Sequence, residues 1–387
     1  MIPVFVDTFF PNGSPLHWRQ AEDGAVELYP IPDHARFGPN RQFTHWHLRL
    51  HVPPGTPPGT LAVRIASVMN CWNGREAPAM SRKFVRGVVS ADGIAWSGLD
   101  GCASDRPGVA AEFAVPVAGR VAHFATLVPY TEADLDGLLA RLGRSNLARV
   151  YNLGSTVEGR ALPFFELGRA DAPESVFLRA RAHPWETGGS WLIEGLVDRL
   201  LDGSAASQAL LDGVRFCVQP MANRDGVNRG MSRFTVTGMD LNRDWHPAVP
   251  HDPVLAPENA VLALWFAEQH RLGRIPRLAI DLHNDDGGNL HFSHPARDAA
   301  AFVARQTRFE ELLREHTWFT EGHTAAGFHN AGTFGEGLSE QYGINAFIWE
   351  LRATQADGLG RQPLAADWKQ LGAAFVEVAA RYLRETA

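Results

Sequence analysis

Alternating polar and apolar positions dominate the first third of the chain. Between residues 45 and 52 every second residue is apolar, which predicts a half-buried strand. These apolar positions are Trp46, Leu48, Leu50 and Val52. Further short apolar runs follow at residues 61–68, 84–89 and 121–128. Turns rich in proline and glycine separate the runs, so we expect an antiparallel β-sandwich here.

The pattern changes near residue 130. Thr131 can cap a helix whose leucines at positions 135, 138, 139 and 142 recur at helical spacing. Beyond it, strand-like segments at residues 176–180, 214–218, 278–282 and 346–349 alternate with helix-like segments at residues 190–201 and 258–269. This alternation predicts an α/β fold with a mixed, mostly parallel sheet flanked by helices. We therefore expect an N-terminal β-sandwich domain at residues 1–128 and an α/β domain at residues 129–387.

Composition narrows the function classes. The chain has 387 residues, of which 45% are hydrophobic, so it can bury a large core. A formal net charge of -7 and the lack of a block of like charges argue against a nucleic-acid partner. The N-terminus does not read as a secretory signal and no apolar run reaches membrane-spanning length, so we expect no membrane partner and a cytoplasmic location. Three scattered cysteines are typical of reduced thiols.

Polar residues follow the predicted strands of the second domain. His183 and Glu186 come after the first strand, His283 ends the third, and Glu350 ends the fourth. Ligands gather beyond the carboxyl ends of the strands in such sheets, so these side chains should meet. Two histidines and a glutamate form a common catalytic zinc site. His183, Glu186 and His283 are therefore the predicted metal ligands, and Glu350 is the predicted general base.

A second polar segment lies at residues 238–245. Asn242 and Arg243 are adjacent, and an amide beside a guanidinium suits a planar carboxylate. Arg233 could stabilise an oxyanion as charge develops on an attacked carbonyl. Asp240 is a candidate partner for a metal-bound histidine, because such histidines donate their second N–H to a carboxylate or carbonyl.

Four motifs in this order resemble the zinc metallocarboxypeptidase family of carboxypeptidase A. They are His183-Pro-Trp-Glu186, Asp240-Leu-Asn-Arg243, Asp281-Leu-His283 and Glu350-Leu-Arg352. Residues 151–163 also resemble the entry into that family's catalytic domain, so the similarity spans about residue 150 to the C-terminus. Within the family, residues 124–135, 180–184 and 223–226 are similar to the cytosolic carboxypeptidase branch, in which a β-sandwich precedes the catalytic domain.

This resemblance implies one Zn²⁺ per chain, bound by His183, Glu186 and His283. Glu350 would be the base, Arg233 would polarise the scissile carbonyl, and Asn242 with Arg243 would hold the C-terminal carboxylate of a peptide or protein substrate. Two positions depart from the family. Arg224 replaces the usual proline of an Asn-Pro-Asp-Gly motif. The family's mobile tyrosine has no clear counterpart, since Phe328 lies about where it would fall and Tyr342 is too close to Glu350.

Substrate preference and two alternative functions stay open. Members of the cytosolic branch tend to remove acidic residues, often glutamate, so we expect that preference, with Arg181, Arg229 and Arg352 as candidates for the basic group. A zinc amidohydrolase acting on N-acyl amino acids uses similar ligands and is the alternative enzyme. A binding module without catalysis is the third reading. The histidines at positions 45, 47 and 51 are interpreted as a solvated strand face.

Overall fold

The computed structural model describes residues 2–246, 250–293, 295, 299–325 and 332–386. It divides into two compact units, which are described separately. The first unit comprises Met1–Glu132 together with Asp225–Met239, and the second comprises Ala133–Arg224 and Asp240–Ala387. The segment Asp225–Met239 thus packs with the N-terminal strands although it lies far along the chain. The domain boundary predicted between residues 128 and 129 stays a prediction.

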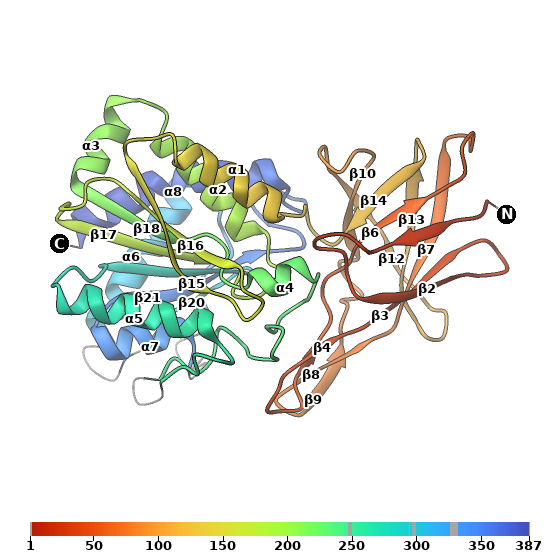
Figure 1. Cartoon of the computed structure of the whole chain (residues 1–387), viewed down its shortest axis with the longest axis horizontal. Coiled ribbons are helices and arrows are strands. Elements are labelled where there is room, and N and C mark those ends of the chain that lie inside the picture. Colours follow the sequence, from red (N-terminus) through yellow and green to blue (C-terminus); the bar gives the residue numbers. More distant parts are fainter. Residues whose placement is uncertain (1, 247–249, 294, 296–298, 326–331, 387) are drawn as a thin grey trace. The chain divides into compact units, whose positions relative to one another are not determined.

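The first unit is a β-sandwich (Figure 1). One sheet has the order β1 (Phe5–Asp7), β6 (His47–His51), β14 (Val121–Ala125), β10 (Arg86–Ser90) and β11 (Ser97–Asp100). The other has the order β12 (Cys102–Ala103), β13 (Val109–Val117), β7 (Gly59–Ala66), β3 (Val26–Pro30) and β2 (Leu16–Gln20). A smaller sheet contains β4 (Asp33–His34), β5 (Arg41–Gln42), β8 (Met69–Trp72) and β9 (Arg75–Pro78). The pairing of β3 with β7 is parallel, which the expectation of an antiparallel sandwich missed.

The strand predicted at residues 45–52 is β6, and its apolar side is buried as expected. Leu48 and Leu50 are fully buried in a core that both sheets share. The prediction that the histidines form a solvated face is wrong for two of them, because His45 and His47 are also buried. The His47 ring packs edge-on against Phe10, and its Nδ1 lies 3.0 Å from Asn12 Oδ1. The N-terminal segment before β2 covers this side of the strand, and alternation within β6 cannot reveal that.

The second unit is built on a seven-stranded sheet. Its order is β15 (Ala148–Ser155), β16 (Ala161–Leu167), β18 (Val214–Gln219), β17 (Glu174–Ala180), β19 (Leu278–Asp285), β21 (Asn345–Arg352) and β20 (Leu290–His291). The central strands β18, β17, β19 and β21 run parallel, and the outer pairs are antiparallel. The four strands predicted in this domain are therefore the parallel centre of a mixed sheet.

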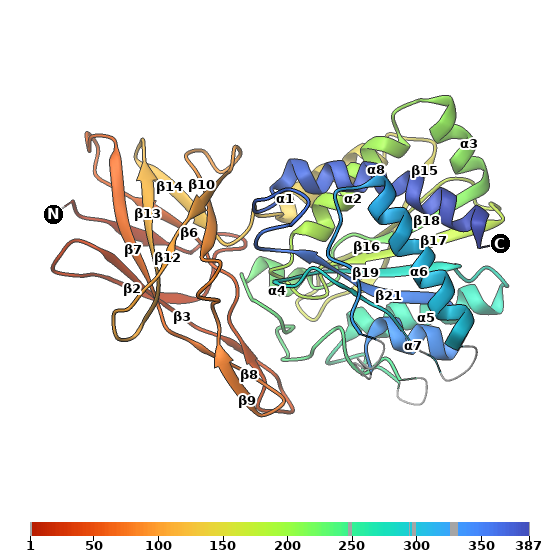
Figure 2. The same ribbon diagram turned by 180° about the vertical axis from the view of Figure 1, so that it is seen from behind.

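Helices cover both faces of this sheet. Helices α2 (Gly188–Leu200) and α8 (Ala365–Glu385) lie on one side, and α5 (Pro257–Arg271) and α7 (Phe334–Tyr342) lie on the other (Figures 1 and 2). This unit also contains α1 (Glu132–Leu142), α3 (Ala205–Gly213) and α6 (Ala299–His316), whereas α4 (Arg224–Asn228) lies almost wholly in the first unit. Among the described residues, no helix is both long and apolar enough to span a membrane.

Alternation along the buried strands assigns their side chains to the two faces. In β17, Val176 and Leu178 belong to the core beneath α2 and α8, whereas Phe177 belongs to the core beneath α5 and α7. In β19, Ala279 belongs to that second core. Side chains two residues apart share a face. Arg179, Asp281 and His283 are therefore on the α5 and α7 side of the sheet.

Candidate metal centre

The turn after β17 carries two of the predicted metal ligands. β17 ends at Ala180, and the next residue, Arg181, has a φ of +62° although it is fully buried. Left-handed backbone is uncommon outside glycine and asparagine, and it collects at functional sites. The amide of Asn223 donates to the carbonyl of Arg181 at 2.9 Å, which holds this conformation. The turn places His183 and Glu186 just before α2.

Close packing fixes the start of α2. A Cβ on Gly188 would lie 2.8 Å from Asn284 Nδ2, and one on Gly189 would lie 2.8 Å from Leu282 Cβ. Asn284 is buried between two elements. Its Oδ1 accepts from the amide of Gly188 at 2.9 Å, and its Nδ2 donates to the carbonyl of Leu351 at 2.7 Å. The residues after Glu186 are thereby tied to the neighbouring strands β19 and β21.

The three predicted metal ligands converge. His183 Nδ1 lies 2.7 Å from Glu186 Oε1, and His283 Nδ1 lies 2.8 Å from Glu186 Oε2. The two Nδ1 atoms are 3.1 Å apart. His183 and Glu186 are each 3% exposed and His283 is fully buried, so bulk water does not solvate this group of donors.

The outer nitrogens of both imidazoles face carboxylates. His183 Nε2 lies 3.1 Å from Asp240 Oδ1, and His283 Nε2 lies 2.8 Å from Asp281 Oδ2. A neutral imidazole has one N–H, and a carboxylate partner draws it to Nε2. Each Nδ1 then presents a lone pair to the other and to Glu186. Three donors so close together need either a shared proton or a cation between them, and two histidines with a glutamate match the ligand set of a zinc site.

Electrostatics keep Glu186 ionised. Burial acts to raise its pKa, but His183 and His283 outweigh burial and hold the pKa at about 2. Its Oε2 is buried and lies 2.8 Å from His283 Nδ1. An ionised, buried carboxylate oxygen of this kind is suited to a metal ion, which would balance its charge.

Glu350 stands beside this group. It lies on β21 in register with His283 on β19, and both positions belong to the face that Ala346 and Ala279 share with α5 and α7. Its Oε1 is 3.8 Å from His291 Nε2. Burial lowers the pKa of His291 to about 4, so the imidazole beside Glu350 is neutral near pH 7. Glu350 is thus a half-buried carboxylate on the strand beside His283, and its role as general base stays a prediction.

The predicted carboxylate-binding pair lies on the loop that follows Asp240. Asn242 is buried, and its Oδ1 accepts from the amide of Phe334 at 3.0 Å, so its Nδ2 end is the donor. Arg243 is partly exposed, and its Nη1 donates to the carbonyl of Asn242 at 2.6 Å. Asp240 also accepts from the amide of Asn242 at 2.9 Å. One carboxylate therefore links the imidazole of His183 to the loop that bears both residues.

Arg233 belongs to the first unit. Its guanidinium lies 4.3 Å from the ring centroid of Trp72, and its Nη1 donates to Gln42 Oε1 at 3.4 Å. The Asp33 carboxylate accepts from its backbone amide at 2.7 Å. A role toward the substrate carbonyl stays a prediction.

The candidates for a basic specificity residue divide by burial. Arg181 is fully buried and its Nη2 donates to the carbonyl of Pro184, so it cannot reach a substrate side chain. Arg352 is partly exposed at the end of β21, with its Nη1 3.2 Å from Asp357 Oδ2. Arg229 lies in the first unit.

The structure does not supply a counterpart for the mobile tyrosine among the two residues considered. Phe328 lies outside the described residues. Tyr342 stacks on Phe266 in the core beneath α5 and α7.

Sequence reasoning missed Arg179. It is fully buried on β17 and forms two bonds to Asp281, from Nε at 2.9 Å and from Nη2. Within the sequence it is one arginine in an apolar run, and its partner lies 102 residues away. An acidic residue two positions before His283 was a signal that could have prompted a search for a basic partner.

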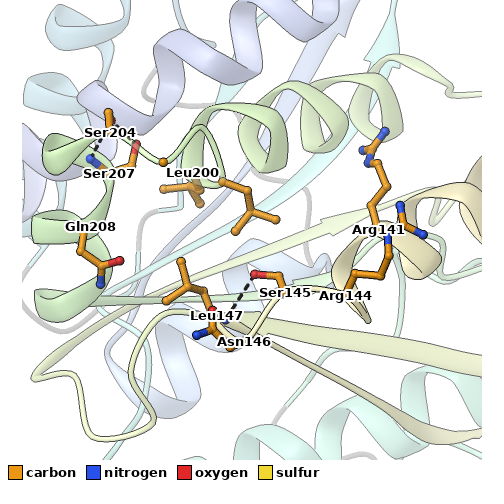
Figure 3. Close-up of a pocket in the computed structure, with 11 residues that line it drawn as sticks. Arg141, Arg144, Ser145, Asn146, Leu147, Leu200, Ser204, Ser207 and Gln208 are labelled. Atoms are coloured by element: carbon orange, nitrogen blue, oxygen red, sulfur yellow. Dashed lines mark hydrogen bonds between the residues drawn. The ribbon is translucent and has the colours of Figure 1, made fainter.

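A hollow of about 400 Å³ lies at another part of this unit, between α1, α2 and α3 (Figure 3). Arg141, Arg144 and the α3 cap residue Ser204 are among its lining residues. None of the predicted site residues lines it. We therefore do not associate this hollow with the metal donors.

A comparison with known protein families matches the part of the chain that contains most of the candidate site residues. Residues 136–264 match the family model for zinc carboxypeptidases. This region contains His183, Glu186 and the loop at residues 240–243. The matched residues belong to a zinc carboxypeptidase domain. The family named from the motifs is thus confirmed, and its single catalytic zinc ion agrees with the donor set.

Relatives of this zinc carboxypeptidase domain include the cytosolic carboxypeptidases. Cytosolic carboxypeptidase 1 of Mus musculus is 32% identical over 157 residues, which cover 34% of this chain and 13% of that protein. An uncharacterized protein of Zymomonas mobilis is 32% identical over 136 residues, covering 35% of each. The chain therefore spans about a third of the length of one relative and much less of the other.

A solved structure resembles the whole chain. The metallo-carboxypeptidase from Burkholderia cenocepacia has a TM-score of 0.82 and 22% identity, with 99% of this chain and 100% of that chain covered. At this identity the likeness shows the fold alone. It confirms the predicted fold class, a carboxypeptidase-like α/β domain preceded by a β-sandwich.

Proposed function

We propose that this protein is a zinc-dependent metallocarboxypeptidase that hydrolyses the C-terminal peptide bond of peptides or proteins. The convergence of His183 Nδ1, His283 Nδ1 and the Glu186 carboxylate within 3.1 Å of one another carries the proposal. When bound there, zinc supplies a Lewis acid that activates water and polarises the scissile carbonyl. The zinc carboxypeptidase match over residues 136–264 supports the same reading.

The chain's own residues would perform the remaining steps. Glu350 would take the proton of the attacking water and return it to the leaving amine. Asn242 and Arg243 would hold the substrate's terminal carboxylate, with the Nδ2 donor of Asn242 directed by its bond to Phe334. Arg233 would stabilise the developing oxyanion. Each role is assigned by the chemistry of the side chain and its motif.

We further propose a preference for acidic C-terminal residues, often glutamate. Of the basic candidates in the second unit, Arg352 is partly exposed, whereas Arg181 is fully buried. The cytosolic carboxypeptidase relatives support a protein or peptide tail as the substrate. We propose a cytoplasmic location on the same basis.

The experiment is digestion of a mixed peptide library by the zinc-loaded chain. Each peptide is supplied with a free and with an amidated C-terminus. We expect release of single C-terminal residues from free termini alone, with glutamate released first. Equal cleavage of amidated peptides would contradict the carboxylate-binding role of Asn242 and Arg243. Faster release of aromatic or basic residues would contradict the acidic preference, and Glu350→Gln is the matched inactive control.

A further inference from the structure

Arg179 is a buried cation with partners on two sides of the candidate site. It is fully buried on β17 and its guanidinium lies 4.4 Å from the ring centroid of Phe334 and 5.3 Å from that of Trp245. Burying a charge costs several kcal/mol unless it is paired and hydrogen-bonded. Proteins retain such a group where its geometry matters, so its partners indicate what it holds in place.

One side of the guanidinium reaches the metal donors. Arg179 and Asp281 are register partners on the parallel strands β17 and β19, and they form a forked pair through Nε and Nη2. The fork fixes the plane of the carboxylate. Asp281 Oδ2 also lies 2.8 Å from His283 Nε2. The orientation of the His283 imidazole therefore depends on a carboxylate that Arg179 holds.

The other side reaches the loop with the carboxylate-binding residues. Both Nη atoms lie 3.4 Å from the carbonyl oxygen of Leu241, and Nη1 donates to Asn259 Oδ1 at 3.2 Å. The Leu241 carbonyl also accepts from Asn259 Nδ2 at 3.0 Å and from Trp245 Nε1 at 2.9 Å. Leu241 sits between Asp240 and Asn242, so its carbonyl is the anchor of that loop.

We propose that Arg179 is a positioning residue that couples the metal centre to the substrate-carboxylate loop. It holds His283 through Asp281, and it holds residues 240–243 through the Leu241 carbonyl. The inference rests on the proposed function for the loop's role in substrate binding. The other part of the inference, that Arg179 supports zinc binding through Asp281 and His283, depends only on the positions of the predicted zinc ligands.

Arg179→Met tests both halves in the full-length chain. Competition with a chelator measures zinc affinity, and we expect a loss of about 10-fold, the lower end of the range for removing a direct partner of a metal ligand, because Arg179 acts on His283 through Asp281. Hydrogen exchange read by mass spectrometry should show faster exchange of the amides at residues 240–245. At saturating zinc, KM for a free-terminus peptide should rise more than kcat falls, because loop disorder weakens substrate binding.

Arg215→Met is the matched control. Arg215 is also a buried arginine of the same sheet, on β18, and its Nη2 donates to Gln269 Oε1 at 3.1 Å. It aligns with Ser175, four residues before Arg179, or about 13 Å away along the strand. This variant should lose stability while keeping zinc affinity and slow exchange at residues 240–245.

Two further variants keep the proposal testable if Arg179→Met does not fold. Arg179→Lys retains the charge without the planar fork and should show the same losses at smaller size. Arg179→Ala with added guanidinium chloride, at millimolar concentrations below those that denature, should regain zinc affinity. Zinc affinity and exchange rates that match the unsubstituted chain in Arg179→Lys, or equal losses in Arg215→Met, would overturn the proposal. A chain that binds zinc but cleaves no peptide would refute the proposed function alone.

Discussion

Asp240 offers a sharp test of the donor geometry, because its Oδ1 serves two partners. This oxygen lies 3.1 Å from His183 Nε2 and accepts a hydrogen bond from the Asn242 amide at 2.9 Å. Asp240→Asn keeps a carbonyl oxygen but removes the charge, whereas Asp240→Ala removes both. Without an acceptor, the His183 proton can move to Nδ1, where the imidazole cannot bind a metal.

The size of the effect follows from that contact. Loss of such a partner costs about 10- to 100-fold in metal affinity, which corresponds to about 1.4 to 2.7 kcal/mol. We expect Asp240→Asn near the lower figure and Asp240→Ala near the upper one. Chelator competition at pH 7.5 measures both, and it requires no assumption about substrate.

Asp171→Asn provides the control for charge alone. Asp171 pairs with Arg169 on the surface, with exposed fractions of 71% and 59%, and such pairs contribute little. Its zinc affinity should equal that of the unsubstituted chain. Unchanged affinity in Asp240→Ala would refute the assignment of His183 as a ligand oriented by Asp240, and so would an equal loss in Asp171→Asn.

Three other outcomes are expected. Glu350→Gln should lower kcat by about 10²- to 10⁴-fold with zinc affinity unchanged, and steady-state kinetics that show full activity would contradict its role as base. Removing zinc held at a thousandfold excess over its Kd should lower stability by about 4 kcal/mol, hence the Tm of the second unit, which has a size of roughly 150–250 residues, by roughly 8–16 °C; calorimetry that shows no shift would speak against a preformed site. Burial, helped by the charges of His45, His123 and Arg49, holds the pKa of His47 well below its ordinary value. Below pH ~6.5 the unfolded chain thus binds a proton at His47 that the folded chain does not bind. The free energy of unfolding therefore falls as the pH drops below ~6.5, by up to about 1.4 kcal/mol per pH unit. Urea titrations at pH 7.5 and 5.5 should show a smaller pH effect for His47→Gln, and equal effects would contradict this.

The fold followed from periodicity because the parallel strands are buried on both faces. Mostly apolar runs such as residues 214–218 and 278–282, each interrupted by one charged residue, are typical of strands at the centre of a parallel sheet. They correspond to β18 (Val214–Gln219) and β19 (Leu278–Asp285). The parallel pairing of β3 with β7 escaped prediction, since it depends on which strands meet in space and leaves no mark on either strand's alternation.

The placement of Asp225–Met239 also escaped prediction. Asp33 accepts from the backbone amides of Ser232, Arg233 and Phe234 at 2.7 to 3.2 Å, and about 200 residues separate it from them. A carboxylate can accept hydrogen bonds from the backbone amides of any turn. The sequence of one segment therefore does not indicate that it contacts the other. The closeness of Arg233 to Asp240 in the sequence therefore does not indicate the compact unit to which Arg233 belongs.

In the candidate site, too, contacts between residues close in sequence could be predicted, whereas contacts between separate strands could not. His183 and Glu186 could be paired from the sequence because one turn of backbone sets their separation. The residues that orient them could not, because the relevant distances join separate strands. Arg179 and Arg181 show the limit most clearly. They are two residues apart in sequence, Arg179 within the strand predicted at residues 176–180 and Arg181 just after it. Yet Arg179 lies on the strand and forks to Asp281, whereas Arg181 lies beyond the strand end with positive φ. The register between β17 and β19 pairs Arg179 with Asp281, and this pairing makes Arg179 the residue through which the metal donors and the substrate loop would be joined.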